Sequence, residues 1–427
     1  MKGAGENARV FWILMALVST AFGGCDAISR RTLHLWQFWD VSIIRPMLDR
    51  FESEHPGVRV KARQLNWKDG LEEIQAALVS GREPDVCELG SSWLARFADD
   101  GVLADLTAVY EAQSDSFLLW DSAFWKGRVW GLPWVHAPRA LFYNRGLFRR
   151  AGLDPDPPPA TWEQLLRAAA IIDSLDADID GFGQNHGERF VPYKNFLALA
   201  WGNGGRILDD NGAIIFNDAR TLEALEFYRS LSGYSRMGTQ EALDRRFMEG
   251  RLGMQISGAW NLKRFRELAP DLDFGVALVP KPAVDRGEHV SFSGSQLLVV
   301  FRDSGDTTES IELARFLHRY PMSRRLALAD GSVFPASIQV YGDTAFTGDV
   351  RVRTFLEQAL TSRPAPVHPA WIDMEDIVNS AVEEVLEGRR APRWCLRSAA
   401  EEMAELAARF DQLRSDPGFR ADDRSAR

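Results

Sequence analysis

The chain has 427 residues, 45% of them hydrophobic and 26% charged, which is the composition of a water-soluble globular protein of about two or three domains. Its formal net charge of −10, without any Lys/Arg-rich run, excludes the basic surface that binding to nucleic acid requires. Three cysteines are too few for a disulfide framework, and neither they nor the seven histidines have the spacing of a metal site. We therefore expect no nucleic-acid partner, no metal and no cofactor.

The first 24 residues have the pattern of an export signal. Lys2 and Arg9 precede an apolar run at 10–22, which is too short to cross a hydrocarbon layer of about 30 Å. The run ends in two glycines and Cys25, which resembles a bacterial lipoprotein signal, although Phe22 stands where that pattern usually has Leu. This resemblance implies removal of residues 1–24 and a lipidated Cys25 that anchors an exported, periplasmic or cell-surface protein to the membrane.

After the signal, strand and helix patterns alternate. Aromatic and apolar residues at 32–39 predict a buried strand, and apolar residues at helical spacing over 43–51 predict an amphipathic helix. Alternation at 58–63 predicts a second strand, which is followed by a helix at 71–79 and a third strand at 85–89. This β-α-β-α-β order is typical of a parallel sheet.

The same rhythm continues toward the C-terminus. Thr161 and Gln164 have the spacing of a capping box, which predicts a helix start. Further strands are expected at 213–216, 253–257 and 297–301, and further helices at 221–230, 311–318, 374–386 and 400–413. The segment 415–427 is polar and lacks apolar periodicity, which indicates a frayed tail.

Short motifs in a fixed order resemble the extracellular solute-binding proteins of carbohydrate ABC transporters, the family related to maltose-binding protein. The matching stretches are FESEHPGVRV at 51–60, PDV at 84–86, SSW at 91–93, GRVWGLPW at 127–134, LFYNR at 141–145, AGL at 151–153, TWE at 161–163, GGRIL at 204–208 and GMQISGAW at 253–260. The resemblance implies an α/β, two-lobed fold of the type II periplasmic-binding-protein class. Each lobe would be a mixed, mostly parallel sheet flanked by helices, and a solute would be captured as the lobes hinge shut.

The resemblance also implies three crossings between the lobes, near 137–141, 276–280 and 341–345. The N-terminal lobe would then comprise residues 25–138 and 278–343, the C-terminal lobe residues 139–277 and 344–414, and the tail residues 415–427. Cys87 and Cys395 would lie in different lobes, where a disulfide would block hinge motion. We expect both to be free, buried thiols.

A sugar presents hydroxyl groups and an apolar C–H face, so its site needs aromatic platforms beside hydrogen-bonding side chains. The chain has 14 tryptophans. From the family's motif positions and from neighbouring turns and polar residues, the candidate ligand-binding residues are Trp36, Gln37, Asp85, Ser91, Trp93, Trp134, Trp201, Trp260, Gly294, Ser295 and Trp371. A role in the core remains open for each tryptophan and for Gln37, and Asp85 can equally cap a sheet edge.

The sequence thus predicts the monomeric substrate-binding component of an ABC importer, which captures a mono- or oligosaccharide and delivers it to the permease transmembrane subunits. A receptor for a non-sugar solute on the same fold is an alternative: a polyamine would need more carboxylates, and a phosphate ester would need Arg and helix N-termini. A glycoside-acting enzyme would need two facing carboxyl groups, and no catalytic motif is present. A purely structural lipoprotein is the last alternative. We assign no catalytic residue.

Overall fold

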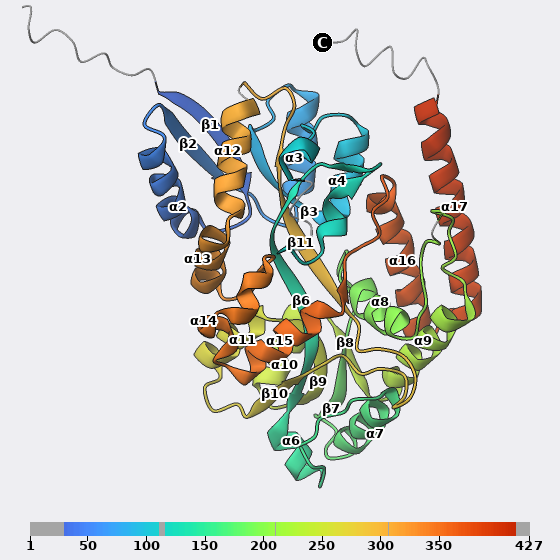
Figure 1. The fold of residues 1–427 in the computed structure, drawn as a ribbon. Helices are drawn as coiled ribbons and strands as arrows, with labels where there is room; N and C mark the ends of the chain where they lie inside the picture. Colours follow the sequence, from blue (N-terminus) through green and yellow to red (C-terminus); the bar gives the residue numbers. More distant parts are fainter. Residues whose placement is uncertain (1–29, 111–115, 210, 306, 416–427) are drawn as a thin grey trace, which may run out of the picture.

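The computed structural model describes residues 30–110, 116–209, 211–305 and 307–415 (Figure 1). The predicted signal at 1–24, the lipidation candidate Cys25 and the tail beyond residue 415 lie outside the described residues.

The β-α-β-α-β order predicted for residues 32–89 is the order that the chain adopts. β1 (Arg31–Gln37) pairs in parallel with β2 (Val58–Gln64) on one side and with β3 (Val86–Gly90) on the other. The connecting helices are α2 (Val41–Glu54) and α3 (Gly70–Val79). The parallel sheet expected from the sequence is therefore confirmed.

One path of hydrogen-bonded strands runs through the molecule in the order β2-β1-β3-β11-β6-β9-β7-β8. Its centre is β6 (Leu132–Asn144). Residues 132–138 of β6 pair antiparallel with β11 (Ser291–Val300), whereas residues 139–143 pair antiparallel with β9 (Leu252–Gly258). Figure 1 shows β6 and β11 running between an upper group, which holds β1 to β3, and a lower group, which holds β7 to β9. These groups are the two lobes.

The helices of both lobes flank this sheet. The other helices are α4 (Ser91–Asp99), α5 (Thr107–Tyr110), α6 (Arg145–Arg150), α7 (Trp162–Asp173), α8 (Pro192–Gly202), α9 (Ala219–Ser230), α10 (Gln240–Met248), α11 (Trp260–Leu268), α12 (Thr307–His318), α13 (Tyr320–Asp330), α14 (Thr344–Thr347), α15 (Val350–Leu360), α16 (Trp371–Leu386) and α17 (Pro392–Ser415). The other strands are β4 (Phe124–Trp125), β5 (Arg128–Val129), β7 (Asp180–Asn185), β8 (Ser235–Gly238), β10 (Phe274–Ala277), β12 (Phe334–Pro335) and β13 (Ser362–Arg363). Thr161 and Gln164 form the predicted capping box at the start of α7.

Apolar side chains fill both lobes and the strand between them. One cluster belongs to the lower lobe and includes Trp162 and Met254. Another extends from Phe51 in the upper lobe along β6 to Phe247 and Phe265. Because helices and loops cover both of its faces, β6 is buried along almost its whole length and is nearly continuous in apolar residues.

The strand predicted at 213–216 does not form. The Asp209 carboxylate accepts hydrogen bonds from the backbone N–H groups of Asn211 and Ala213, which folds this stretch into a turn. Only an isolated bridge joins Leu208 to Ile214. Of the apolar residues here, only Phe216 is buried, and it packs in the lower-lobe cluster from a loop and not from a sheet.

The chain was predicted to cross to the upper lobe at 276–280. The segment that follows β10 instead still packs on the lower lobe. The Trp162 Nε1 donates a hydrogen bond to the carbonyl of Pro280, and Arg286 forms an ion pair with Glu223 of α9. We therefore propose that the second crossing lies within β11. The other lobe boundaries stay predictions from the sequence.

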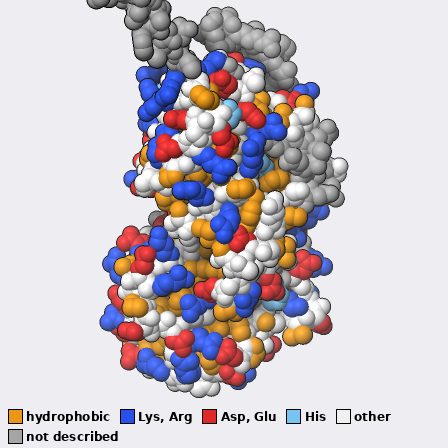
Figure 2. All heavy atoms as spheres, turned by 60° about the vertical axis from the view of Figure 1, so that its left-hand side comes forward, with side chains coloured by type: hydrophobic (Ala, Val, Ile, Leu, Met, Phe, Trp, Pro, Cys, Tyr) orange, Lys and Arg blue, Asp and Glu red, His pale blue; other side chains and the backbone are white. Residues whose placement is uncertain are grey.

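Two further expectations concern the surface and the thiols. Figure 2 shows acidic and basic side chains intermingled over the visible face, without a continuous basic patch there. Within the described residues, no helix is long and apolar enough to span a bilayer. Cys87 and Cys395 are both free and buried, as predicted, and burial raises the pKa of both thiols.

The close approach of α7 to β7 gives a test of the lower lobe. A Cβ added at Gly181 would lie 2.0 Å from the carbonyl oxygen of Ala169, so Gly181→Ala forces the helix and strand apart. We expect the change to lower the free energy of unfolding by about 1–3 kcal/mol in urea denaturation. Gly57→Ala is the control, because nothing lies within 4 Å of its added Cβ. Equal stability of the two variants would contradict this packing.

Candidate functional site

A cavity of about 300 Å³ lies where β6 changes its partner from β11 to β9. Ala137 and Arg139 of β6 line it, since alternate residues of a strand face the same side. The upper lobe contributes the junction of β3 and α4, and the lower lobe contributes residues of α8, α11 and α16. A molecule in this cavity would contact both lobes.

Aromatic rings form part of the cavity wall. Trp67 and Trp93 line it, with ring centroids 5.6 Å apart, and Phe38 stacks on Trp67 from behind at 3.9 Å. On the lower lobe the ring of Trp260 lies directly over Gly258, where an added Cβ would come within 1.8 Å of the ring. Glycine at 258 is therefore required for this placement of the Trp260 ring.

Three cations and one carboxylate line the cavity. Arg139 is only 8% exposed, and its guanidinium lies 5.3 Å from the Trp260 ring centroid. Burial lowers the pKa of Arg139 to about 10 and that of the neighbouring Lys194 to about 8. Arg189, the third cation, is largely exposed and forms an ion pair with Asp376 at 2.9 Å.

The carboxylate is Glu375 of α16, and it is buried. Its Oε1 accepts hydrogen bonds from the Tyr193 hydroxyl at 2.8 Å and from the Trp371 Nε1 at 2.7 Å. Burial raises the pKa of Glu375, while the nearby Lys194 ammonium opposes that shift. Glu375 therefore has donors within the protein that hold it in place.

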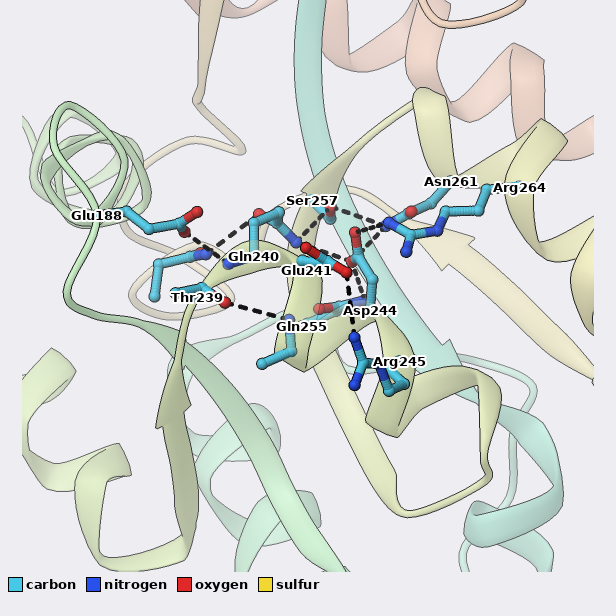
Figure 3. Close-up of polar contacts among 12 residues, drawn as sticks. Glu188, Thr239, Gln240, Glu241, Asp244, Arg245, Gln255, Ser257, Asn261 and Arg264 are labelled. Carbon is cyan, nitrogen blue, oxygen red and sulfur yellow. Dashed lines mark hydrogen bonds and ion pairs between the residues drawn. The ribbon is translucent and has the colours of Figure 1, made fainter. Parts of the chain in front are cut away.

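A second buried carboxylate, Asp244 of α10, organises the lower lobe next to the cavity (Figure 3). Its Oδ1 accepts hydrogen bonds from the side-chain amides of Gln240, Gln255 and Asn261 at 2.8, 3.0 and 2.6 Å. Gln240 and Asn261 also donate to the Ser257 hydroxyl, each at 3.0 Å. This network fixes the end of β9, from which Gly258 and Trp260 follow.

Several helices begin at the cavity. Ser91 is the first residue of α4, Tyr193 the second of α8 and Trp260 the first of α11, and all three line the cavity. The N-terminus of a helix carries free N–H groups and the positive end of the helix dipole. The cavity is therefore rich in hydrogen-bond donors.

The structure brings five of the predicted ligand-binding residues into this cavity: Ser91, Trp93, Trp260, Gly294 and Ser295. They come from the β3–α4 junction, from the start of α11 and from β11, which are distant in the sequence. Gly294 pairs with Ala137 of β6, so its lack of a side chain leaves the middle of the cavity wall open.

Three predicted residues of the upper lobe lie outside the cavity. Gln37 is fully buried in the core, because it shares the inward face of β1 with Leu35. Trp36 faces the opposite side, where Arg63 covers its ring. Asp85 accepts a hydrogen bond from the backbone N–H of His34 at 2.7 Å, so it caps the sheet edge.

The other three tryptophans are also separated from the cavity. Trp134 is buried in the core against Trp39. Trp201 stacks on Phe292, which itself lines the cavity, so Trp201 lies one ring behind the wall. Trp371 is fully buried and contacts the cavity wall from behind, through its hydrogen bond to Glu375 and its ring contact with Tyr193.

Sequence reasoning missed most of the polar lining. Arg139, Lys194, Tyr193 and Glu375 were not among the candidates, although all four line the cavity. A signal was available for Arg139, which is a single charge within an otherwise apolar strand. A charge at such a position is expensive to bury unless it has a function.

The comparisons with known proteins agree with this architecture. The model of the bacterial extracellular solute-binding protein family matches residues 40–318. The chain belongs to this family. A Brucella abortus protein whose name assigns it no specific solute is 26% identical, with 82% of this chain and 86% of the relative covered. The sn-glycerol-3-phosphate-binding periplasmic protein of Pectobacterium atrosepticum is 23% identical, with 93% and 96% covered.

Solved structures show the same fold. The sugar-binding protein of Xanthomonas citri superposes with a TM-score of 0.79 at 21% identity, with 90% of this chain and 98% of that chain covered. A solute-binding protein of Thermotoga lettingae gives 0.77 at 24% identity, with 88% and 100% covered. The two-lobed periplasmic-binding-protein fold is therefore confirmed, and the protein is a bacterial extracellular solute-binding protein by family. The family description and the name of the Pectobacterium relative both state solute binding.

Asp244 allows a test of the network in Figure 3. Asp244→Asn leaves one oxygen to accept from the three amides but removes the negative charge that strengthens these hydrogen bonds, and it places an amide donor opposite Arg264, so we expect the free energy of unfolding to fall by about 1–3 kcal/mol. Glu241→Gln on the exposed side of the same helix is the control, since its ion pair with Arg245 is exposed and contributes little. Urea denaturation measures both. An Asp244→Asn variant as stable as the control would show that the network does not stabilise the fold.

Proposed function

We propose that this protein captures a mono- or oligosaccharide in the cavity between its lobes and delivers it to the transmembrane subunits of an ABC permease. The observation that carries the proposal is the pairing of the Trp260 and Trp93 rings with hydroxyl and amide groups of Ser91, Ser295 and Gln296 around one cavity. Rings can stack on the C–H face of a sugar while the polar groups bind its hydroxyls. The Thermotoga lettingae structure, which contains tagatose, supports a carbohydrate as the solute.

The arrangement of charges argues against two of the alternatives. A glycosidase would need two facing carboxyl groups, whereas Glu375 is the single carboxylate among the described residues that line the cavity. A polyamine would need carboxylates in excess, whereas cations outnumber them here. We propose that the protein acts by binding alone, without catalysis, and as a monomer.

A phosphate ester is the second candidate solute. The cavity has the arginine and the helix N-termini that such a solute needs. The Pectobacterium relative is named for sn-glycerol 3-phosphate, and a structure with glycerophosphocholine, from Mycobacterium tuberculosis, superposes with a TM-score of 0.76.

Thermal melting of the protein without residues 1–24 tests the proposal against sugars, polyols, amino acids, polyamines and phosphate esters. A solute at about 100 times its dissociation constant stabilises the folded state by ~2.7 kcal/mol, which raises the melting temperature by several degrees. We expect a sugar to produce this shift. If only charged, non-sugar solutes raise the melting temperature, the solute is not a sugar and the sugar-binding proposal is wrong. If no solute raises it, none of these classes contains the ligand.

The Trp260 platform is tested by Trp260→Ala. We expect the variant to bind the identified sugar more weakly by about 0.5–1.5 kcal/mol in titration calorimetry, because the ring contact is lost. Trp394→Ala is the matched control, since this tryptophan is exposed on α17 outside the cavity. Unchanged affinity in the Trp260→Ala variant would remove this ring from the site.

We also propose that lipidated Cys25 anchors the exported protein. Cys25→Ser removes the sulfur that would carry the lipid, so the variant should appear in the soluble periplasmic or culture fraction and the parent protein in the membrane fraction. Cys395→Ser controls for loss of a thiol, since Cys395 is buried in the fold. Immunoblots of the two fractions decide this, and equal distribution of parent and Cys25→Ser would contradict the anchor.

A further inference from the structure

The cavity contains cationic donors that the protein itself does not pair. Arg139 is more than nine-tenths buried, and its Nη1 has no hydrogen-bond partner. An ion pair requires a nitrogen and an oxygen within 4.0 Å of each other. Among the described residues, no carboxylate oxygen lies that close to the Arg139 guanidinium. Burying an unpaired charge is costly, and proteins normally pair such a charge or use it in a site.

Lys194 is a second cation of the cavity wall, and its side chain is only partly buried. Its ammonium lies 5.7 Å from the Tyr193 ring centroid and 5.4 Å from that of Phe292, both of which line the cavity. Within the described part of the chain it forms no ion pair or hydrogen bond. Lys194 and Arg139 therefore share the cavity with Arg189, and Glu375 lies close enough to Lys194 to oppose the lowering of its pKa.

The nearby carboxylates are already engaged elsewhere. Glu375 accepts from Tyr193 and Trp371, and Asp244 accepts from three side-chain amides and faces Arg264 at 3.5 Å. Glu188 accepts a hydrogen bond from the backbone N–H of Gln240 at 2.6 Å. These carboxylates moderate the field at Arg139 without contacting it. Nη1 of Arg139 is therefore left without an acceptor in the protein, and a bound solute can supply one.

We propose that the solute carries an acidic group, a carboxylate or a phosphate, on a sugar or polyol, and that Arg139 and Lys194 bind this group. The inference rests on the proposed function and specifies the solute class of the same cavity. A guanidinium presents paired N–H donors that match the oxygens of either acid, and the ammonium adds a point charge. The helix N-terminus at Ser91 adds positive potential.

The remaining polar groups suit the hydroxyl groups of such a solute. Ser295 Oγ and Gln296 Oε1 are buried, line the cavity and have no hydrogen-bond partner in the protein. One can donate to a hydroxyl group and the other can accept from it. Trp260 lies against Arg139, so a ring bound on this indole would hold its acidic substituent near the guanidinium.

Matched solutes that differ by one acidic group test the inference. The pairs are D-glucose with D-glucuronate, D-galactose with D-galacturonate, and glycerol with sn-glycerol 3-phosphate, added to the protein without residues 1–24 at equal ionic strength. We expect the acidic member of at least one pair to raise the melting temperature by several degrees more than its neutral partner. A larger shift with a uronate would identify the acidic group as a carboxylate, and a larger shift with sn-glycerol 3-phosphate would identify it as a phosphate.

Arg139→Gln should lower the affinity for that acidic solute about ten- to a hundredfold, as expected for a charge-assisted hydrogen bond, and the affinity for its neutral partner less than about threefold. Arg266→Gln is the matched control, because it removes the same charge from the exposed face of α11. Without solute, the melting temperature of Arg139→Gln should not fall, since an unpaired buried charge is removed. A purely structural arginine would give a lower melting temperature.

Failure of this inference can be distinguished from failure of the proposed sugar-binding function. If neutral sugars shift the melt at least as much as their acidic partners, the inference is overturned and the sugar-binding proposal stands. If no member of any pair shifts the melt, both are overturned for these solutes. Equal loss of acidic and neutral binding in Arg139→Gln would make Arg139 a positioning residue for the cavity wall and would also overturn the inference.

Discussion

The change of partner along β6 is the constraint on which the rest of the structure depends. Up to Pro138 this strand pairs with β11, and from Arg139 onward it pairs with β9. The sheets of the two lobes diverge at that point, and the cavity opens between them. Because Ala137 and Arg139 lie on the same side of the strand, the residues on either side of the switch both face the cavity. The geometry of the site therefore follows from the backbone pairing that joins the lobes.

The same arrangement links binding to the relative position of the lobes. Ser91 and Trp93 approach the cavity from the upper lobe, and Tyr193, Lys194 and Trp260 approach from the lower lobe. A solute that contacts both sets has a greater affinity for the closed arrangement, and it can shift the equilibrium only by that difference in affinity. The Asp244 network and the contact of Gly258 with Trp260 fix the lower wall in advance, so little ordering of this wall is left for the binding step.

The sequence predicted the order of elements and the fold class better than the site. Periodicity located β1 to β3 and the capping box at α7, because these depend on neighbours within a few residues. The cavity depends on pairing between residues more than a hundred positions apart, such as Ala137 with Gly294 and Arg139 with Gly258. Motif position selected Trp260 and Gly294, which line the cavity, whereas Trp36 and Gln37 lie outside it, because strand parity and the exact strand end decide which residue faces the crevice. Phe38, the next residue, is the one that supports the cavity through Trp67.

The unpaired donors explain how a cavity lined with tryptophans can still discriminate between solutes. A neutral sugar that stacks on Trp260 leaves the buried Nη1 of Arg139 without an acceptor. A buried polar group that stays unpaired in a complex costs more than a missing methylene group, so this kind of rejection is stronger than any that ring stacking provides. Glu375 differs from Arg139, because its carboxylate already accepts hydrogen bonds from donors within the protein. A bound oxyanion therefore need not approach Glu375. Aromatic rings thus provide affinity for the sugar face, and the imbalance between donors and acceptors selects the solute that carries an acid.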